Sequence, residues 1–337
     1  MKSSRAHLFS ARKIAVVRTD RLGDMVLTLP LCKSLKDNCS KAELHIIARR
    51  YVEPLLENCP AIDKAFFIDD YKKGINEILK KVKYDVVFFP RPRFNECWEG
   101  FKAGIPLRIG SAYRYYSILM NNRVHDHRKT AEFHEAEFNT RLAESVLGMQ
   151  LKTELVKPFI DQSSVVRIEN ILNNNGLETD KKFIIIHPGS GGSAFTWHAE
   201  NFGLLGRELE KKSDIKIIIT GNEQENIICN VVQEYCKCSV NLCGKLSIKE
   251  MIALISKSNL LIANSTGIIH ISAAMDVPVI GLYPNTPHLS PKRWGPYSKK
   301  SIVITPPEVD NFKERDNMNR ISIDEVMKAV EKLLILN

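Results

Sequence analysis

The strongest chemical signal in the sequence is a turn of small and hydroxylated residues between an apolar run and a helical pattern. Residues 260–263 are all apolar, residues 264–267 read Asn-Ser-Thr-Gly, and His270 follows one helical turn after Thr266. The N-terminus of a helix carries about half a positive charge and presents backbone N–H groups that the helix itself does not use. A diphosphate would be well placed there, although a hydroxyl cap beside a packed histidine is the alternative. The candidates for binding it are Ser265, Thr266, Gly267 and His270.

A second signal lies near the N-terminus, where residues 18–24 follow the apolar run 14–17. Gly23 permits a tight turn, and Asp24 falls near the start of the next helix. A carboxylate there is commonly a first-turn residue that the helix dipole stabilises by up to about 1 kcal/mol. At the end of a strand it is also placed to act as a general base, which is our hypothesis for Asp24. The pattern G-x-G-x-x-G of dinucleotide-binding turns is absent from this loop.

Two further loops carry residues suited to a nucleotide. Residues 187–193 contain three glycines and two serines, and such a loop lets backbone N–H groups approach an anion closely. Ser190 and Gly191 are the candidates here, with a flexible loop as the alternative. Glu223, or less favourably Glu225, stands just past a strand end, where a carboxylate can accept hydrogen bonds from ribose hydroxyls. An ordinary acidic helix start would explain the same pattern.

These loops need elements that bring them to one edge of a sheet, and short apolar runs alternate with helical patterns along the chain. Apolar runs without strict alternation are typical of strands buried on both faces of a parallel sheet. The predicted strands are 14–17, 43–48, 65–68, 85–89, 183–187, 215–220, 260–263, 277–282 and 302–305. The predicted helices are 25–36, 75–82, 131–147, 165–173, 201–211, 223–235, 248–256, 268–275 and 323–336. Two such βαβ series predict an α/β fold with two Rossmann-like parallel-sheet domains and a cleft between them.

A polar stretch at residues 150–163, which contains Pro158, is the predicted linker between the two series. We therefore divide the chain into an N-terminal domain at 1–155, a C-terminal domain at 156–320 and a final helix at 321–337. Ligands of parallel sheets bind at the carboxyl ends of the strands, which is where all the loops named above are expected.

The chain carries a net charge of +9, which favours anionic partners such as nucleic acid, anionic lipids or phosphorylated substrates. Residues 91–129 hold eight Lys and Arg residues against three acids, mixed with aromatic residues and without a regular helix or strand pattern. This stretch is a candidate acceptor site whose cations would meet phosphates, and a solvated basic loop is the alternative. It contains no RNA-binding motif, so nucleic acid is not an expected partner.

No apolar run approaches the roughly 18 residues that a membrane span needs, and residues 1–13 are polar and basic. These features predict a cytoplasmic protein. Eight cysteines without an export signal predict reduced thiols. Cys236 and Cys238 lack the second ligand pair that a zinc site would need.

In order and spacing, these loops resemble those of the lipopolysaccharide heptosyltransferases, glycosyltransferase family 9. The resemblance runs over nearly the whole chain. In the first half it rests on residues 14–30, 42–46 and 60–63, and in the second half on residues 186–190, 244–247, 264–274 and 278–283. The combination of Leu-Gly-Asp at 22–24 with Ser-Thr-Gly-x-x-His at 265–270 is specific to this family.

The resemblance implies a GT-B architecture and an inverting, metal-independent transfer of a heptose from ADP-heptose to the phosphorylated inner core of lipopolysaccharide, without a cofactor. It implies that the acceptor binds the N-terminal domain, that the nucleotide-sugar binds the C-terminal domain, and that the protein makes peripheral contact with the cytoplasmic face of the inner membrane. Asp24 then matches the general base. The donor contacts are Ser190, Gly191, Glu223, Ser265, Thr266, Gly267 and His270. The expected acceptor contacts are Arg18, Arg21, Arg91, Arg93 and Arg114.

Two positions depart from the family pattern. Ser265 stands where the family often has Asp, and Phe195 stands where it commonly has a lysine that meets the donor phosphate. Lys292 and Arg293 are the nearest cationic replacements along the sequence. The alternatives are therefore a related transferase that uses another nucleotide-sugar, and a catalytically weakened homologue that keeps the nucleotide site. A Rossmann oxidoreductase or epimerase is disfavoured because the glycine pattern of such enzymes is absent.

Overall fold

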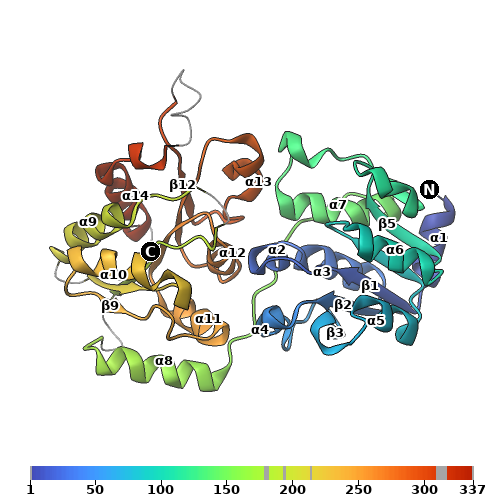
Figure 1. Cartoon of the computed structure of the whole chain (residues 1–337), viewed down its shortest axis with the longest axis horizontal. Coiled ribbons are helices and arrows are strands. Elements are labelled where there is room, and N and C mark those ends of the chain that lie inside the picture. The colour runs from blue at the N-terminus through green and yellow to red at the C-terminus, as the bar shows by residue number, and fades with distance from the viewer. Residues whose placement is uncertain (1, 178–181, 193–194, 213–214, 309–316, 336–337) are drawn as a thin grey trace. The chain divides into compact units, whose positions relative to one another are not determined.

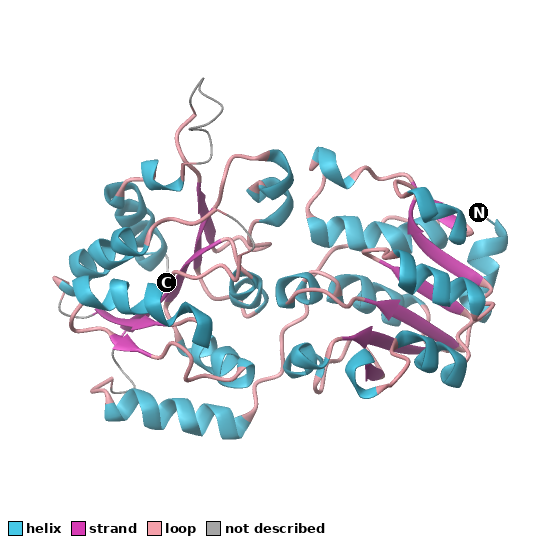
Figure 2. Cartoon of the chain, viewed as in Figure 1, coloured by secondary structure: helices cyan, strands magenta, loops and turns pink. Residues whose placement is uncertain are grey.

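The computed structural model describes residues 2–177, 182–192, 195–212, 215–308 and 317–335. The chain divides into two compact units, residues 1–159 and residues 160–337. Each unit is an α/β domain built on a six-stranded parallel sheet with helices packed against it (Figures 1 and 2). The predicted fold class of two Rossmann-like parallel-sheet domains is therefore confirmed.

The sheet of the first unit has the strand order β3-β2-β1-β4-β5-β6. Its strands are β1 (Lys13–Val17), β2 (Glu43–Ala48), β3 (Lys64–Phe67), β4 (Val86–Phe89), β5 (Leu107–Ser111) and β6 (Asn122–Val124). Its helices are α1 (Lys2–Ser10), α2 (Leu22–Val26), α3 (Leu29–Asn38), α4 (Glu53–Leu56), α5 (Ile75–Val82), α6 (Phe94–Lys102) and α7 (Glu135–Leu147). The central strands β1 and β4 are buried almost throughout, which explains their continuous apolar sequence.

The second unit repeats this topology, with the strand order β12-β11-β10-β7-β8-β9. Its strands are β7 (Lys182–His187), β8 (Ile215–Ile219), β9 (Val240–Asn241), β10 (Leu260–Asn264), β11 (Val279–Leu282) and β12 (Ser301–Ile304). Its helices are α8 (Gln162–Asn174), α9 (Ala199–Glu210), α10 (Asn226–Tyr235), α11 (Ile248–Lys257), α12 (Gly267–Ala274), α13 (Pro291–Trp294) and α14 (Ile323–Ile335).

Both sheets have one point where the strand order reverses, between β1 and β4 in the first unit and between β7 and β10 in the second. Ligands of open parallel sheets bind outside the carboxyl ends of the strands at this switch point, because the connections leave it in opposite directions and open a crevice. The loops after these four strands carry most of the candidate site residues. Topology therefore supports the choice of loops made from the sequence.

Several predicted elements differ from the structure. The single helix expected at 25–36 is two helices, α2 and α3, and the carbonyl of Leu27 at the break accepts a hydrogen bond from the side chain of Asn139 (2.9 Å). The helix expected from residue 131 begins at Glu135, because Ala131 has a left-handed backbone (φ +50°) and His134 caps the first turn. The stretch 91–129, expected to be irregular, contains α6, β5 and β6. The helix expected from residue 165 begins at Gln162.

Candidate functional site

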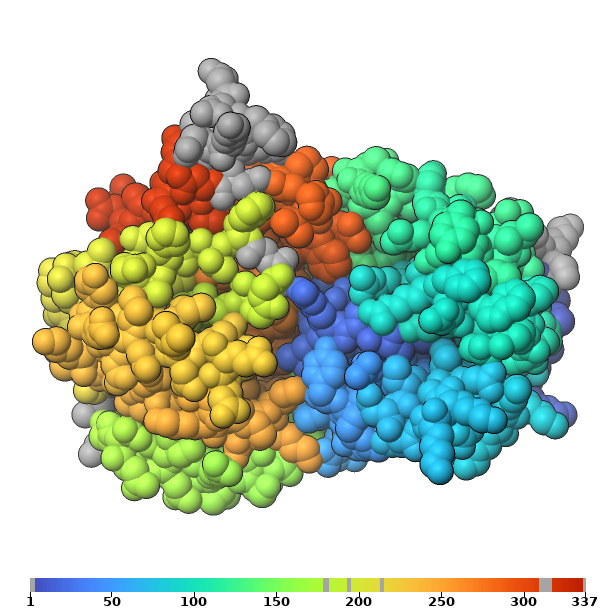
Figure 3. All heavy atoms as spheres, in the orientation of Figure 1, coloured from blue at the N-terminus to red at the C-terminus, as the bar shows by residue number. Residues whose placement is uncertain are grey.

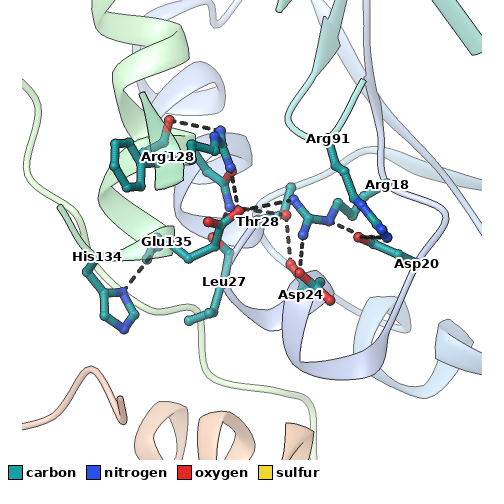
Figure 4. A network of polar contacts seen from close by, with 12 residues as sticks. Arg18, Asp20, Asp24, Leu27, Thr28, Arg91, Arg128, His134 and Glu135 are labelled. Carbon is teal, nitrogen blue, oxygen red and sulfur yellow. Dashed lines mark hydrogen bonds and ion pairs between the residues drawn. The ribbon is translucent and has the colours of Figure 1, made fainter. Parts of the chain in front are cut away.

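The first part of the candidate site is the loop that leaves β1 at the switch point of the first unit. The backbone N–H of Arg18 still donates to the carbonyl of Ile47 on β2 (2.9 Å), so the sheet holds the start of this loop. Asp24 lies in the first turn of α2, whose N-cap residue Arg21 makes no side-chain cap hydrogen bond. This turn points the Asp24 carboxylate back toward the Arg18 side chain (Figure 4).

The Arg18 side chain is the centre of a buried ion cluster (Figure 4). Its guanidinium is 1% exposed and donates through Nε to Asp20 Oδ1 (2.6 Å). One terminal nitrogen donates to Asp24 Oδ1, and the other lies 3.8 Å from Glu135 Oε1. Two carboxylates that follow β1 and a third from α7 therefore share one guanidinium, which fixes the direction in which Asp24 points.

Two further arginines extend this ion cluster. Arg91, in the loop after β4, lies 3.0 Å from Asp20 Oδ2 and is half exposed. Arg128 donates to Glu135 from the other side. The inner carboxylates thus have cations on two sides, and Arg91 connects the buried part of the cluster to the surface at the switch point.

The surroundings move the pKa values of the two aspartates in opposite directions. Burial raises the pKa of Asp24 above its ordinary value, Arg18 opposes this shift, and the negative charges of Asp20 and Glu135 reinforce it. Burial acts on Asp20 too, but Arg18 and Arg91 together hold the pKa of that carboxyl below its ordinary value. Neighbouring carboxylates whose pKa values differ in this way suit different roles, and the one with the raised pKa is suited to take up a proton.

Another buried carboxylate lies beside the same loop. Glu96 on α6 is 8% exposed and accepts a hydrogen bond from the Thr19 hydroxyl. Burial raises the pKa of Glu96 as well. This contact joins the start of α6 to the loop after β1, and the sequence contained no signal for it because the two residues are far apart in the chain.

The second part of the candidate site is the turn that follows β10 in the second unit. Thr266 is the N-cap of α12, has an extended backbone and makes no side-chain cap hydrogen bond. The N–H of Ser265 donates to the carbonyl of Leu282 (3.0 Å). Within the described part of the chain, the N–H groups of Thr266, Gly267 and Ile268 meet no backbone or side-chain acceptor. A helix start with open N–H groups is an anion-binding element.

The buried side chain of Asn264 ties this turn to the loop after β7. Its Nδ2 donates to the carbonyl of Pro188 (2.7 Å), and its Oδ1 accepts from the N–H of Trp197 (2.9 Å). Asn264 is fully buried, so both hydrogen bonds are made away from water. A buried amide with both ends satisfied holds the two switch-point loops in register, because each lost partner would leave a backbone group unpaired.

The Glu225 carboxylate organises the glycine-rich loop after β7. It accepts from the N–H of Gly191 (3.0 Å) with one oxygen and from the N–H of Asn222 (2.9 Å) with the other. A Cβ at Gly189 would lie 2.0 Å from this carboxylate, so only glycine fits there. Both carboxylate oxygens of Glu225 therefore accept hydrogen bonds from backbone N–H groups, whereas the Glu223 side chain is exposed.

Tyr283 connects the turn to the short helix that carries two of the predicted cations. It shares a side-chain hydrogen bond with Ser265, and its hydroxyl donates to the carbonyl of Trp294 at the end of α13 (2.8 Å). Lys292 and Arg293 belong to α13, and the Arg293 guanidinium lies 4.6 Å from the centre of the Trp294 ring. Tyr283 thus joins the end of α13 to the Ser265 turn, and the role of Lys292 and Arg293 as replacement cations stays a prediction.

Comparison with known proteins identifies the family. The model of glycosyltransferase family 9 (heptosyltransferase) matches residues 74–322. A Haemophilus influenzae protein provisionally named a glycosyltransferase is 30% identical, over 94% of this chain and 95% of its own length. The chain belongs to glycosyltransferase family 9. Lipopolysaccharide heptosyltransferase 2 of Salmonella typhimurium is less similar to this chain, with 25% identity over 87% of each chain.

A solved structure supports the fold of this glycosyltransferase. The Escherichia coli ADP-heptose lipopolysaccharide heptosyltransferase II aligns with a TM-score of 0.79 and 21% sequence identity, over 96% of this chain and 99% of that chain. Among the residues that the structure describes, no helix is both long and apolar enough to cross a membrane. All eight cysteines are free thiols, and only Cys238 is exposed.

The structure changes one of the expected acceptor contacts of the glycosyltransferase. Arg21, Arg93 and Arg114 are exposed and Arg91 is half exposed, as an acceptor contact requires. The Arg18 guanidinium instead is buried among three carboxylates, so it does not reach the surface where an acceptor phosphate would bind. Two of these carboxylates, Asp20 and Asp24, lie close to Arg18 in the sequence, whereas the third, Glu135, comes from α7 and was not expected from the sequence.

Four residues that organise the site were not singled out from the sequence for these roles. Glu135 completes the ion cluster of the first unit, Glu96 holds the loop after β1 through Thr19, and Asn264 and Glu225 hold the loops of the second. Only Asn264 and Glu225 lay within a recognised motif. A buried polar residue next to a binding turn is a usable signal, but its partners come from distant segments that a single sequence does not pair.

Proposed function

We propose that this glycosyltransferase transfers a heptose from ADP-heptose to the phosphorylated inner core of lipopolysaccharide, with inversion and without a catalytic metal. The observation that carries the proposal is that each unit has a chemically suitable group at its own switch point. The first unit has a largely buried carboxylate, 15% exposed, with a raised pKa, and the second unit has a helix start with open N–H groups. The names of the Salmonella typhimurium and Escherichia coli relatives support the donor and the acceptor.

In the proposed reaction, the hydroxyl oxygen of the acceptor attacks the anomeric carbon of the donor sugar, and Asp24 takes the proton of that hydroxyl. The bond from that carbon to the diphosphate breaks on the opposite face, which inverts the centre and passes through an oxocarbenium-like state, as in glycoside hydrolysis. The leaving diphosphate gains charge, and the N–H groups at Thr266 and Gly267 with His270 stabilise it. Arg18 acts as a positioning residue, because it fixes the Asp24 carboxylate without touching a substrate.

The proposed donor site includes Ser190, Gly191 and Glu223 beside the turn, with Lys292 and Arg293 as its cations. Arg21, Arg91, Arg93 and Arg114 are the proposed contacts for the acceptor phosphates. The protein is proposed to work in the cytoplasm, in peripheral contact with the inner membrane, where such an acceptor is anchored.

A second candidate function is transfer from a different nucleotide-sugar, and one observation favours it. Phe195 is 54% exposed in the loop where the family commonly has a phosphate-binding lysine. An apolar ring at this position cannot bind the donor phosphate as a lysine does. A weakened homologue that binds the nucleotide-sugar without transferring it rests on the same observation.

A binding screen followed by a transfer assay tests these functions. The purified protein is titrated calorimetrically with ADP-heptose, ADP-hexoses and UDP-hexoses, and each bound donor is then incubated with a heptose-deficient lipopolysaccharide acceptor. We expect ADP-heptose to bind most tightly and to be consumed only when acceptor is present. Tighter binding of a UDP-hexose would overturn the donor assignment, and binding without transfer would favour the weakened homologue.

The proposed cations of the donor site give a direct prediction. Replacing both Lys292 and Arg293 with Ala is expected to weaken ADP binding by about 10–100-fold, because hydrogen bonds to charged phosphates are among the stronger ones. Calorimetric titration with ADP measures the change. Lys299→Ala, at an exposed lysine beyond α13, is the control and should leave affinity unchanged. Equal affinity of the double variant and the wild type would mean that other groups hold the diphosphate.

The raised pKa of Asp24 predicts the acid side of the pH profile. The base must be ionised to accept a proton, and burial means that it loses its charge at a higher pH than an exposed aspartate does. We expect kcat/KM to fall with decreasing pH, with a midpoint above about 3.9, the ordinary value for Asp. The pH dependence of kcat/KM measures it. A midpoint at or below that of an exposed aspartate would contradict the assignment.

A further inference from the structure

Five large apolar side chains stand together at the surface of the first unit. Three belong to α6, and two belong to the short helix η3 (Tyr115–Leu119) that follows β5. We call them the aromatic patch: Phe94, Trp98, Phe101, Tyr115 and Ile118. Tyr115 is 86% and Ile118 78% exposed, and the segment lies at the surface of this unit (Figure 3, in teal). Contiguous apolar surface of this kind marks an interaction site in a folded protein.

The aromatic patch is an ordered surface. Phe94 and Trp98 are four residues apart on α6, and their rings are nearly parallel at 6.3 Å. Tyr115 stacks against the same Phe94 ring at 6.3 Å, which joins η3 to α6. The hydroxyl of Tyr116 donates to the carbonyl of Pro92 (2.8 Å) and fixes η3 beside the start of α6. The side chains are therefore held outward on two linked elements.

Two exposed arginines lie at the starts of the two elements that carry the aromatic patch. Arg93 and Arg114 flank its two elements, are exposed, and form no ion pair with the described residues. Each of the three acids in residues 91–129 contacts a residue other than these two arginines. Glu96 is buried against Thr19, Glu99 pairs with Lys102, and Asp126 pairs with Arg141.

We propose that the aromatic patch is the surface on which the protein lies against an anionic lipid bilayer. Tyr and Trp rings suit the headgroup region because one part of each ring system is apolar and another can hydrogen-bond to water. Arginines beside them are attracted to anionic headgroups. A sugar-stacking platform would explain the rings, but an aliphatic side chain as exposed as Ile118 contributes nothing to such a platform, whereas it inserts readily among acyl chains.

The position of the aromatic patch connects it to the candidate site within the same unit. Arg93, the N-cap of α6, is two residues from Arg91, which pairs with Asp20 in the cluster that holds Asp24. A lipid-anchored acceptor held at the bilayer surface would therefore meet the switch point of the first unit. This step rests on the proposed function, whereas binding of the patch to lipid does not.

The test compares variants of the full chain for binding to vesicles. Vesicles of phosphatidylcholine mixed with phosphatidylglycerol, and vesicles of phosphatidylcholine alone, are sedimented with the wild type and with the double variant Tyr115→Ser/Ile118→Ser. Both side chains are exposed, so the fold should be kept, and Ile227→Ser, 79% exposed on α10, is the matched control. We expect the double variant to bind the anionic vesicles about tenfold more weakly or worse, and the control to bind like the wild type.

The charge contribution is tested separately. Arg93→Gln/Arg114→Gln should weaken binding to the anionic vesicles by about fivefold for each arginine, and Arg207→Gln, at an exposed arginine on α9, should not. Equal vesicle binding by the wild type and Tyr115→Ser/Ile118→Ser would overturn the proposal. So would a double variant that loses only self-association in sedimentation velocity, which would make the patch a contact between two copies.

An activity readout separates this proposal from the proposed function. With an acceptor embedded in vesicles, Tyr115→Ser/Ile118→Ser should transfer sugar about tenfold more slowly than the wild type at low lipid concentration. With a water-soluble acceptor that lacks acyl chains, the two proteins should be equally active. Loss of vesicle binding in a protein that transfers no sugar to either acceptor would support the aromatic patch and overturn only the proposed function.

Discussion

Asp24→Asn is expected to lower the rate of sugar transfer by about 10²–10⁴-fold, the contribution of a general base. The amide has the shape of the carboxylate and can still accept a hydrogen bond from Arg18, but it cannot take the proton of the acceptor hydroxyl. Affinity for ADP should change by no more than a few-fold, because the turn proposed to bind it belongs to the second unit. Steady-state kinetics and calorimetric titration with ADP measure the two effects.

Asp37→Asn is the matched control for this substitution. Asp37 is an exposed aspartate at the end of α3 that pairs with Lys33 on the helix surface, so its loss should leave kcat and KM unchanged. A thermal melt of each variant shows whether a loss of activity reflects unfolding. Near-wild-type transfer by a folded Asp24→Asn protein would remove Asp24 from the role of base.

Arg18→Met is expected to lower the free energy of unfolding by about 3–5 kcal/mol, because it removes the shared partner of buried charges. The methionine fills much of the same space, but Asp20, Asp24 and Glu135 would then repel one another with the central cation gone. The pKa of Asp24 should also rise further, since Arg18 lowers it in the native protein. Urea denaturation measures the first effect, and the acid midpoint of kcat/KM, which should move to higher pH, measures the second.

Arg141→Met provides the matched comparison for Arg18. Arg141 makes two hydrogen bonds as Arg18 does, but both go to the carboxylate of Asp126, and the Arg141 side chain is about a third exposed. Loss of such a surface pair should cost about 0.2–1 kcal/mol. Adding Glu135→Gln to Arg18→Met should recover part of the lost stability by removing one repelling charge. If Arg18→Met were no more destabilising than Arg141→Met, the ion cluster would contribute nothing beyond an ordinary surface pair.

The sequence predicted the fold wherever local patterns and topology agree. The apolar runs that became β1, β4, β7 and β10 are central strands buried on both faces, and such strands have a strong sequence signal. Strand β5 was missed because Arg108 and Gly110 interrupt its apolar residues, and β6 has only three residues. Strands with such a weak apolar pattern, β5 between two neighbours and β6 at the edge of the sheet, are specified by their partner strands more than by their own residues.

In the candidate site, too, residues with a local sequence signal were predicted, and residues whose role depends on distant partners were not. The turn at 265–267 was selected from the sequence because it follows a strand directly and begins a helix, and Asp24 because it lies in the first turn of the helix after the first strand. The role of Arg18 could not be predicted in this way, because its burial depends on Glu135, which comes from α7. Asn264 shows the same limit, since its partners lie in the loop after β7.

The ion cluster around Asp24 also constrains how this enzyme can change over time. The cluster balances three cations against three anions: Arg18, Arg91 and Arg128 against Asp20, Asp24 and Glu135. Replacing Arg18, Asp20 or Glu135 alone leaves a charge without its counterpart among side chains that are only 1–2% exposed, so tolerated replacements there should occur in compensating pairs. Among descendants of a common ancestor, Arg18 and Glu135 are therefore expected to be inherited or lost together. A library that randomises this pocket should vary Arg18 and Glu135 jointly, because clones altered at only one of them are expected to lose stability.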